Sequence, residues 1–336
     1  MRHMTDTVPS SRKLGTLPVS PIGLGCMNLS HAYGLPPSAD DAAGLLLRAL
    51  DLGVTHFDTA ALYGFSANET LVGRVLAPHR HRFTLASKCG MTGVDGKRVI
   101  DGRPKTLKAT CEAALKRLRT DVIDLYYLHR WDKSVPIEDS VGALGQLVQE
   151  GKIRAVGLSE VSATTLRRAH AVFPITALQT EYSLWTRNPE IAVLDACRAL
   201  GVAFVAFSPV ARGFLPGTLR EVSGLDAKDI RRAMPRFTPA NYAENLTLLD
   251  GLAEVAREAD CTLAQLALAW LLHRGEHILP IPGTTRVAHL EENLGALRVS
   301  LTPAQLQRLD TLMPPDRVAG ARYNAATQTE VDTEEF

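Results

Sequence analysis

The chain has 336 residues, of which 46% are hydrophobic and 22% are charged, and its net charge is +1. This length allows one large domain or two small ones, and the composition is ordinary for a globular protein. The near-neutral charge gives no electrostatic reason to expect a nucleic-acid or membrane partner. The longest apolar run, residues 263–272, contains Gln265 and is too short to span a bilayer.

The ends of the chain are expected to lie outside the main domain. Residues 1–11 lack the apolar core of a signal peptide, so we expect a flexible leader or a cloning remnant there. Residues 12–324 are expected to form one domain, with 12–20 forming a hairpin that plugs its bottom. The polar residues 325–336 are expected to form a tail over the surface or the site mouth. The five cysteines are odd in number and scattered, which favours a reducing cytoplasm and predicts neither disulfides nor a metal site.

Short apolar runs alternate with longer amphipathic segments along the whole chain. The apolar runs lack strict alternation, which is typical of strands buried on both faces of a parallel sheet. Eight strands are predicted, at residues 22–24, 54–57, 83–86, 122–128, 153–158, 175–179, 202–207 and 278–281. Helical spacing and terminal residues such as Gly53 and Gly151 predict helices at 42–52, 106–118, 141–150, 162–170, 188–200, 246–258, 262–274, 289–297 and 302–312.

Eight strand–helix units over about 300 residues match the count of a (β/α)8 barrel. The alternative, a doubly wound dinucleotide fold, requires Gly-x-Gly-x-x-Gly after the first strand. Here Gly23-Leu-Gly-Cys-Met-Asn28 lacks the third glycine, so that fold is rejected. The long irregular insertion at 208–241 is predicted to be a functional lid or binding loop.

Four polar residues are predicted to meet at the carboxyl ends of the barrel strands, where such barrels carry their active sites. They are Asp58, Tyr63, Lys88 and His129. Singly, each has an ordinary structural explanation, such as a helix cap or a packed tyrosine. Lys88 favours a functional interpretation of the group. A lysine that ends an apolar strand needs a partner for its charge, and Asp58 is the obvious one.

This group is suited to proton transfer to a carbonyl. Tyrosine has an ordinary pKa of about 10, and a nearby cation favours the phenolate and lowers that pKa. We expect Asp58 to hold the Lys88 ammonium against Tyr63, while His129 orients the carbonyl. Tyrosine cannot supply a hydride, so a nicotinamide cofactor is implied.

Several motifs in order resemble the aldo-keto reductase superfamily, in particular its bacterial and plant subgroup of broad-range reductases. They are Gly23-Leu-Gly-Cys-Met27, Phe57-Asp-Thr-Ala-Ala-Leu-Tyr-Gly64, Ala86-Ser-Lys88, Asp124-Leu-Tyr-Tyr-Leu-His-Arg130, Gly151-Lys-Ile-Arg154, Gly157-Leu-Ser159, Gln179-Thr-Glu-Tyr-Ser183, Phe207-Ser-Pro-Val210 and Ile281-Pro-Gly-Thr-Thr285 with Leu290-Glu-Glu-Asn293. The resemblance implies a (β/α)8 barrel that binds NADPH in an extended pose. It also implies that Tyr63 is the general acid, tuned by Lys88 and Asp58, with His129 orienting the substrate.

The resemblance further assigns cofactor contacts. Ser159 and Gln179 would hold the nicotinamide carboxamide, and Phe207 would stack on the nicotinamide ring. Ser208 and Val210 would line the pyrophosphate. The remaining contacts would come from Gly25, Cys26, Met27, Asp58 and Gly283, from Thr284, Thr285 and Arg286 at the 2′-phosphate, and from His289, Glu292 and Asn293 at the adenine.

Three positions depart from the pattern of many relatives. Glu160 stands where asparagine is common beside the carboxamide, Phe207 is often tyrosine, and Gly283 replaces a lysine of some branches, which leaves Arg286 as the main phosphate cation. The resemblance also places the substrate among Met27, His31, Tyr33, Trp131, Trp185 and the long loop. Core packing is the alternative explanation for the two tryptophans.

The function expected from these residues is NADPH-dependent reduction of a small aldehyde or ketone in the cytoplasm. Two other functions remain open from the sequence. One is a non-catalytic NADP(H)-sensing subunit of the same fold, and the other is a Schiff-base aldolase that uses Lys88. Neither the physiological substrate nor an oligomeric partner is predicted.

Overall fold

The computed structural model describes residues 11–336, so the predicted leader, apart from Ser11, lies outside the described residues. Its centre is a sheet of eight parallel strands in the order β12-β11-β10-β9-β8-β5-β4-β3. These are β3 (Leu24–Gly25), β4 (His56–Asp58), β5 (Thr84–Cys89), β8 (Ile123–Leu128), β9 (Ile153–Ser159), β10 (Ile175–Glu181), β11 (Ala203–Phe207) and β12 (Ile278–Pro280). All eight lie at the predicted positions.

The first and last strands meet and close the sheet into a barrel. The amide of Gly23 donates to the carbonyl of Pro280 at 3.0 Å, and Gly25 forms a parallel bridge with Gly283. A Cβ on Gly283 would lie 3.0 Å from the carbonyl oxygen of Gly25. A Cβ there would also lie 2.8 Å from Oδ1 of Asn28, so a larger residue at position 283 would require its neighbours to shift. The predicted (β/α)8 fold is confirmed.

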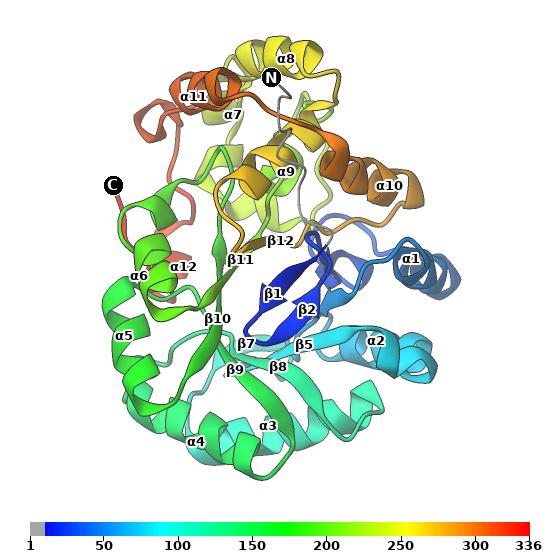
Figure 1. The fold of residues 1–336 in the computed structure, drawn as a ribbon, viewed down its shortest axis with the longest axis vertical. Helices are drawn as coiled ribbons and strands as arrows, with labels where there is room; N and C mark the ends of the chain where they lie inside the picture. The colour runs from blue at the N-terminus through cyan, green and yellow to red at the C-terminus, as the bar shows by residue number, and fades with distance from the viewer. Residues whose placement is uncertain (1–10) are drawn as a thin grey trace, which may run out of the picture.

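Helices surround the barrel, as Figure 1 shows. They are α1 (Ala39–Asp51), α2 (Ala67–Leu76), α3 (Pro104–Leu118), α4 (Ile137–Gln149), α5 (Ala163–Val172), α6 (Val193–Leu200), α7 (Pro239–Leu246), α8 (Leu249–Glu258), α9 (Leu263–His273), α10 (Val287–Gly295), α11 (Pro303–Leu312) and α12 (Ala325–Gln328). A large apolar core fills the space between helices and strands. Among the described residues, no helix is long and apolar enough to cross a membrane.

The N-terminal hairpin plugs the barrel, as predicted. β1 (Arg12–Leu14) and β2 (Leu17–Val19) pair antiparallel, and the hairpin lies across the centre of the strand ring (Figure 1). Leu14 and Val19 belong to the core inside the barrel. The guanidinium of Arg12 donates to the carbonyls of Leu272 and Gly275, which anchors the hairpin at the turn before β12. The opposite end, where the strands finish, stays free for a site.

Several elements differ from the sequence predictions, including the short helix α12 within the predicted tail. Helix α2 and a second hairpin, formed by β6 (Met91–Val94) and β7 (Lys97–Ile100), were not predicted. Helix α7 begins inside the segment predicted to be irregular, and the predicted 188–200 helix is broken into a 3-10 turn and α6. The break falls at Ala192, whose backbone angles, φ −155° and ψ −36°, are not helical.

Candidate active site

Lys88 lies between the carboxylate of Asp58 and the phenol of Tyr63. Its buried Nζ forms an ion pair with Oδ1 of Asp58 and donates to the Tyr63 hydroxyl at 3.1 Å and to the Thr59 carbonyl at 2.9 Å. The second carboxylate oxygen of Asp58 accepts from Nε2 of Gln179 at 2.7 Å. The pairing predicted from the sequence is therefore present, and the buried charges have the partners they need.

The chain after β4 brings Tyr63 to this position. In the parallel register Asp58 lies beside Ala86, so Lys88 is two residues further toward the carboxyl end of β5. The turn that follows β4 stays against β5, because the amide of Ala61 donates to the carbonyl of Lys88 at 3.3 Å. The loop after β4 thus places the Tyr63 hydroxyl next to Nζ of Lys88.

His129 faces Tyr63 across the same site. Its amide donates to the carbonyl of Cys89 at 2.8 Å, which continues the β5–β8 pairing beyond the strand. The rings of His129 and Tyr63 lie edge to face with centroids 5.8 Å apart. Burial lowers the pKa of His129 well below its usual range, and the positive charges of Arg130 and Lys88 add to this effect. The imidazole is therefore neutral at physiological pH.

The pKa of Tyr63 corrects one sequence prediction. A net lowering by Lys88 was expected, but burial raises the pKa of Tyr63 above its ordinary value and outweighs the opposing effect of the ammonium. Burial of Lys88 works to lower its pKa, but Asp58 and Tyr63 outweigh it, and the pKa of Lys88 is raised. Tyr63 therefore holds its proton near neutral pH, and Lys88 stays charged.

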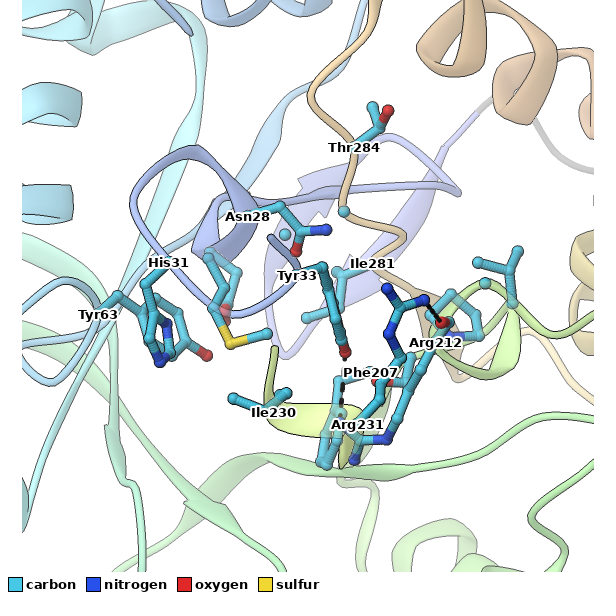
Figure 2. A pocket seen from close by; sticks show the side chains of 18 of the residues that line it. Asn28, His31, Tyr33, Tyr63, Phe207, Arg212, Ile230, Arg231, Ile281 and Thr284 are labelled. Carbon is cyan, nitrogen blue, oxygen red and sulfur yellow. Dashed lines mark hydrogen bonds between the residues drawn. The ribbon is translucent and has the colours of Figure 1, made fainter. Parts of the chain in front are cut away.

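A cavity of about 940 Å³ extends from these residues along the carboxyl ends of the strands. Figure 2 shows Tyr63 and His31 on one side and Phe207 on the other, with Thr284 further away. All predicted cofactor residues except Cys26 line it, namely Gly25, Met27, Asp58, Ser159, Gln179, Phe207, Ser208, Val210, Gly283, Thr284, Thr285, Arg286, His289, Glu292 and Asn293. Cys26 is fully buried and does not line the cavity.

The far end of the cavity offers a positive charge. Arg286 is the N-cap residue of α10, and its amide donates to Oγ1 of Thr284 at 3.1 Å. Within residues 11–336 its guanidinium has no carboxylate within ion-pair distance. A helix N-terminus with an unpaired guanidinium is suited to a phosphate.

The long insertion after β11 contributes a wall of the cavity. Its residue Ile230 reaches the loop after β3, where its amide donates to the carbonyl of Ala32 at 3.0 Å. The guanidinium of the next residue, Arg231, lies 5.0 Å from the ring centre of Tyr33. Figure 2 shows Ile230 and Arg231 beside the cavity. The insertion is therefore joined to the loop after the first barrel strand.

Of the predicted substrate residues, Met27, His31 and Tyr33 line the cavity, whereas Trp131 and Trp185 do not. The indole of Trp131 donates to the carbonyl of Val135 at 2.9 Å, away from the site. Trp185 is buried against Phe214, with ring centres 4.2 Å apart. Both tryptophans thus have the core-packing role that the sequence left open.

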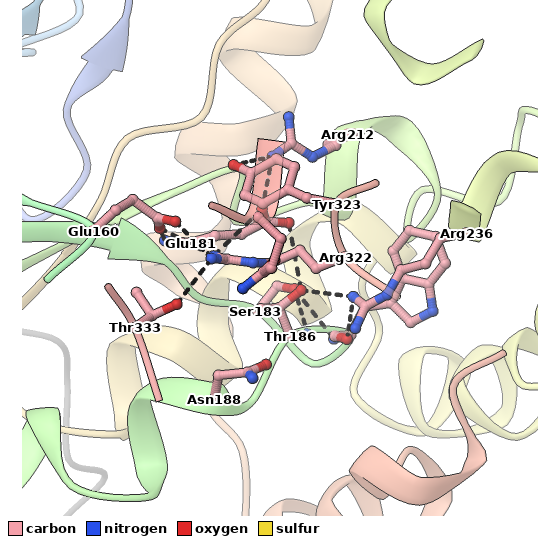
Figure 3. Close-up of polar contacts among 12 residues, drawn as sticks. Glu160, Glu181, Ser183, Thr186, Asn188, Arg212, Arg236, Arg322, Tyr323 and Thr333 are labelled. Carbon is pink, nitrogen blue, oxygen red and sulfur yellow. Dashed lines mark hydrogen bonds and ion pairs between the residues drawn. The ribbon is translucent and has the colours of Figure 1, made fainter. Parts of the chain in front are cut away.

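Glu160 does not line the cavity, and its carboxylate holds Arg322, which precedes the C-terminal tail. Its carboxylate receives two hydrogen bonds from Arg322, at 2.6 and 3.0 Å, and both side chains are buried. A second buried pair joins Glu181 to Arg212 at 2.6 Å, and Arg212 also donates to the hydroxyl of Tyr323 at 3.2 Å (Figure 3). Glu160 therefore holds Arg322, and Arg212 holds the next residue, Tyr323, which lines the cavity.

The cavity lining includes charged and aromatic residues that were not individually predicted from the sequence, among them Arg98, Arg130, Arg212 and Tyr323. Arg98 lies on β7, and the signal for this hairpin was the Asp95-Gly96 pair, whose positive φ angles of 49° and 73° suit a tight turn. Arg130 follows His129 directly and is the last residue of the motif Asp124-Leu-Tyr-Tyr-Leu-His-Arg130. Arg212 and Tyr323 carry no local signal, because their partners are distant in sequence.

The fold and the site define a barrel protein with a buried lysine, carboxylate and tyrosine where the strands end. The family model described as the aldo/keto reductase family matches residues 21–314, and the chain belongs to this family of oxidoreductases.

Relatives match nearly the whole chain. A probable aldo-keto reductase of Glycine max is 44% identical over 326 residues, which cover 95% of this chain and 93% of that protein. Among solved structures, a glycerol dehydrogenase of Gluconobacter oxydans has a TM-score of 0.83 at 27% identity, covering 93% of this chain and 97% of the other. An aldo/keto reductase of Klebsiella pneumoniae, solved with NADP and acetate, has a TM-score of 0.72 at 27% identity, covering 94% and 99%.

Proposed function

We propose that this protein reduces aldehydes or ketones to alcohols with NADPH as the reductant. The observation that carries the proposal is the position of Lys88, whose Nζ contacts both Asp58 and Tyr63 at one end of a cavity. A phenol that keeps its proton and touches a fixed cation is suited to protonate a carbonyl oxygen as negative charge develops there.

Each of the four residues has a separate part in this proposal. Tyr63 donates the proton, and Lys88 stabilises the phenolate that remains. Asp58 holds the ammonium in place, together with the carbonyl of Thr59. His129 is neutral, so it donates a hydrogen bond to the carbonyl oxygen without competing as a stronger acid.

The cavity is suited to the cofactor that the reaction needs. When bound, the nicotinamide supplies the hydride. Ser159 and Gln179 would hold its carboxamide, and Phe207 offers an aromatic face for stacking. Arg286, at the N-terminus of α10, would bind the 2′-phosphate that distinguishes NADPH from NADH. Two Klebsiella pneumoniae structures of the same family were solved with NADP or NADPH, which supports this assignment.

The state of Lys88 argues against a Schiff-base aldolase. A nucleophilic lysine must lose its proton, whereas the pKa of Lys88 is raised by Asp58 and Tyr63 against the opposing effect of burial. Its Nζ is also enclosed by three oxygen atoms.

Substitution of Tyr63 by Phe tests the function directly. With NADPH and a panel of aromatic and aliphatic aldehydes, we expect the wild type to consume NADPH. We expect kcat to fall at least about 100-fold in Tyr63→Phe, because the proton donor is gone. NADPH binding, followed by quenching of protein fluorescence, should remain. Wild-type binding of NADPH without turnover of any carbonyl would instead favour a sensing subunit, and full activity of the variant would exclude the mechanism.

A further inference from the structure

Arg130 presents two unused hydrogen-bond donors at the reacting end of the cavity. It follows His129 at the end of β8 and lines the cavity. Only Nη1 is engaged: it donates to the carbonyl of His129 at 2.7 Å and to Oγ of Ser159 at 3.3 Å. Within residues 11–336, Nε and Nη2 have no hydrogen-bond partner. These two nitrogens form one edge of the guanidinium, the edge that matches the two oxygens of a carboxylate.

The charge of Arg130 also lacks compensation. The other cations near His129 are Lys88, which pairs with Asp58, and Arg98, whose Nη2 lies 2.5 Å from a carboxylate oxygen of Glu330. In the part of the chain that the structure describes, no carboxylate lies within ion-pair distance of Arg130. The reacting end of the cavity thus has an excess of positive charge.

This charge lies close to the group that would transfer the proton. Burial has the largest effect on the pKa of Tyr63, and Arg130 is among the positive charges that oppose it. Arg130 also lowers the pKa of His129, where its charge adds to the effect of burial, and it contacts the main chain of that residue. A ligand anion held by Arg130 would therefore lie beside the carbonyl that Tyr63 and His129 address.

We propose that the physiological substrates are carbonyl compounds that carry a carboxylate, and that Arg130 binds this carboxylate through Nε and Nη2. This inference rests on the proposed carbonyl reduction and narrows its substrate class. Neutral aldehydes lack the group that the guanidinium edge is shaped to bind, so they are the poorer substrates.

Matched pairs of substrates test the proposal. One pair is 4-carboxybenzaldehyde and its methyl ester, and the other is phenylglyoxylate and its methyl ester. Within a pair the two compounds differ little in size, but only the acid is charged. The quantity to measure is the ratio of kcat/KM for the acid to kcat/KM for the ester, because intrinsic reactivity cancels when this ratio is compared between variants.

Arg130→Gln removes the charge and keeps a side chain that can donate hydrogen bonds. We expect the acid-to-ester ratio to fall at least about tenfold in at least one pair, and Arg130→Lys to restore part of it. Arg198→Gln, an exposed arginine on α6, is the matched control and should leave the ratio unchanged. Circular dichroism and NADPH binding confirm that each variant is folded.

The outcomes distinguish failure of the proposed carbonyl reduction from failure of the proposed carboxylate site. If the wild type reduces neither member of a pair nor any other aldehyde, the proposed function itself is wrong. If it reduces both members and Arg130→Gln leaves both ratios unchanged, reduction stands and the carboxylate site is excluded. If Arg130→Gln weakens NADPH binding and lowers acid and ester rates equally, Arg130 serves the cofactor, and the inference is overturned.

Discussion

At the scale of single residues, the burial of Lys88 sets the energetics of the site. Its ammonium has no exposed surface, and its partner Asp58 is 1% exposed. Taking either charge out of water is costly, and their mutual attraction offsets that cost only while both are present. Each charge therefore depends on its partner, and the position of the ammonium against Tyr63 depends on both.

A double-mutant cycle on this pair is the first prediction. Asp58→Asn and Lys88→Met should each lower the free energy of unfolding by about 3–5 kcal/mol, because each leaves one uncompensated buried charge. The double variant should lose clearly less than the sum, since no buried charge remains. Urea unfolding measures all three variants.

The exposed pair Arg198 and Asp195 on α6 serves as the control for this cycle. The coupling free energy between substitutions of Arg198 and Asp195 should be close to zero, because both side chains lie in water. Strictly additive effects of the two substitutions at Lys88 and Asp58 would contradict the account of a mutually dependent pair.

At the scale of elements, the C-terminal tail caps a barrel helix. One carboxylate oxygen of Asp332 accepts from the amide of Ser162 at 3.2 Å, from its hydroxyl at 3.0 Å, and from the hydroxyl of Thr165 at 2.7 Å. Glu334 accepts from the amide of Ala163 at 2.7 Å. Two acidic residues thus satisfy donors at the N-terminus of α5, where negative charge is favourable.

Asp332→Ala should therefore loosen the first turn of α5. We expect a loss of about 1–2 kcal/mol in the free energy of unfolding, comparable to the removal of a helix N-cap. Hydrogen exchange should become faster at the amides of Ser162 and Ala163 in particular. Asp121→Ala, at an exposed position away from α5, is the control, and equal exchange in both variants would show that the tail does not hold this helix.

Helix α2 shows why one element escaped prediction from the sequence. Its buried face includes two polar residues, Asn68 and Glu69, so its apolar spacing is interrupted. Asn68 donates to the carbonyl of Cys26 at 2.8 Å, and Glu69 pairs with Arg117 on α3 at 2.6 Å. Hydrophobic periodicity cannot identify a face that is buried through hydrogen bonds and ion pairs with distant segments.

At the scale of the whole molecule, the barrel makes part of the site predictable. Parallel strands end at one face, so residues that end neighbouring strands, such as Asp58 and Lys88, were predicted to meet. The pKa of Tyr63 was not predictable, because the extent of burial depends on the complete cavity wall. The ion pair of Glu160 was not predictable either, because its partner Arg322 is 162 residues away in the sequence.

The interior of the barrel also makes the stability of the whole protein depend on pH. His56 is fully buried, and within the described residues neither ring nitrogen has a hydrogen-bond partner. Burial lowers the pKa of His56 to about 4. In the unfolded chain the imidazole binds a proton below its ordinary pKa of about 6.5. Between these two values the unfolded state holds more protons, so the free energy of unfolding falls as the pH falls.

We expect His56 to account for about 3 kcal/mol of lost stability between pH of about 6.5 and 4. Urea unfolding across this range measures the slope. His56→Gln cannot take up the proton. The slope of its free energy of unfolding against pH should therefore correspond to about one proton fewer than in the wild type, while the contribution of His129 is preserved. His81→Gln, at an exposed position, should keep the wild-type slope. An unchanged slope in His56→Gln would mean that the buried imidazole does not govern the acid sensitivity of the barrel.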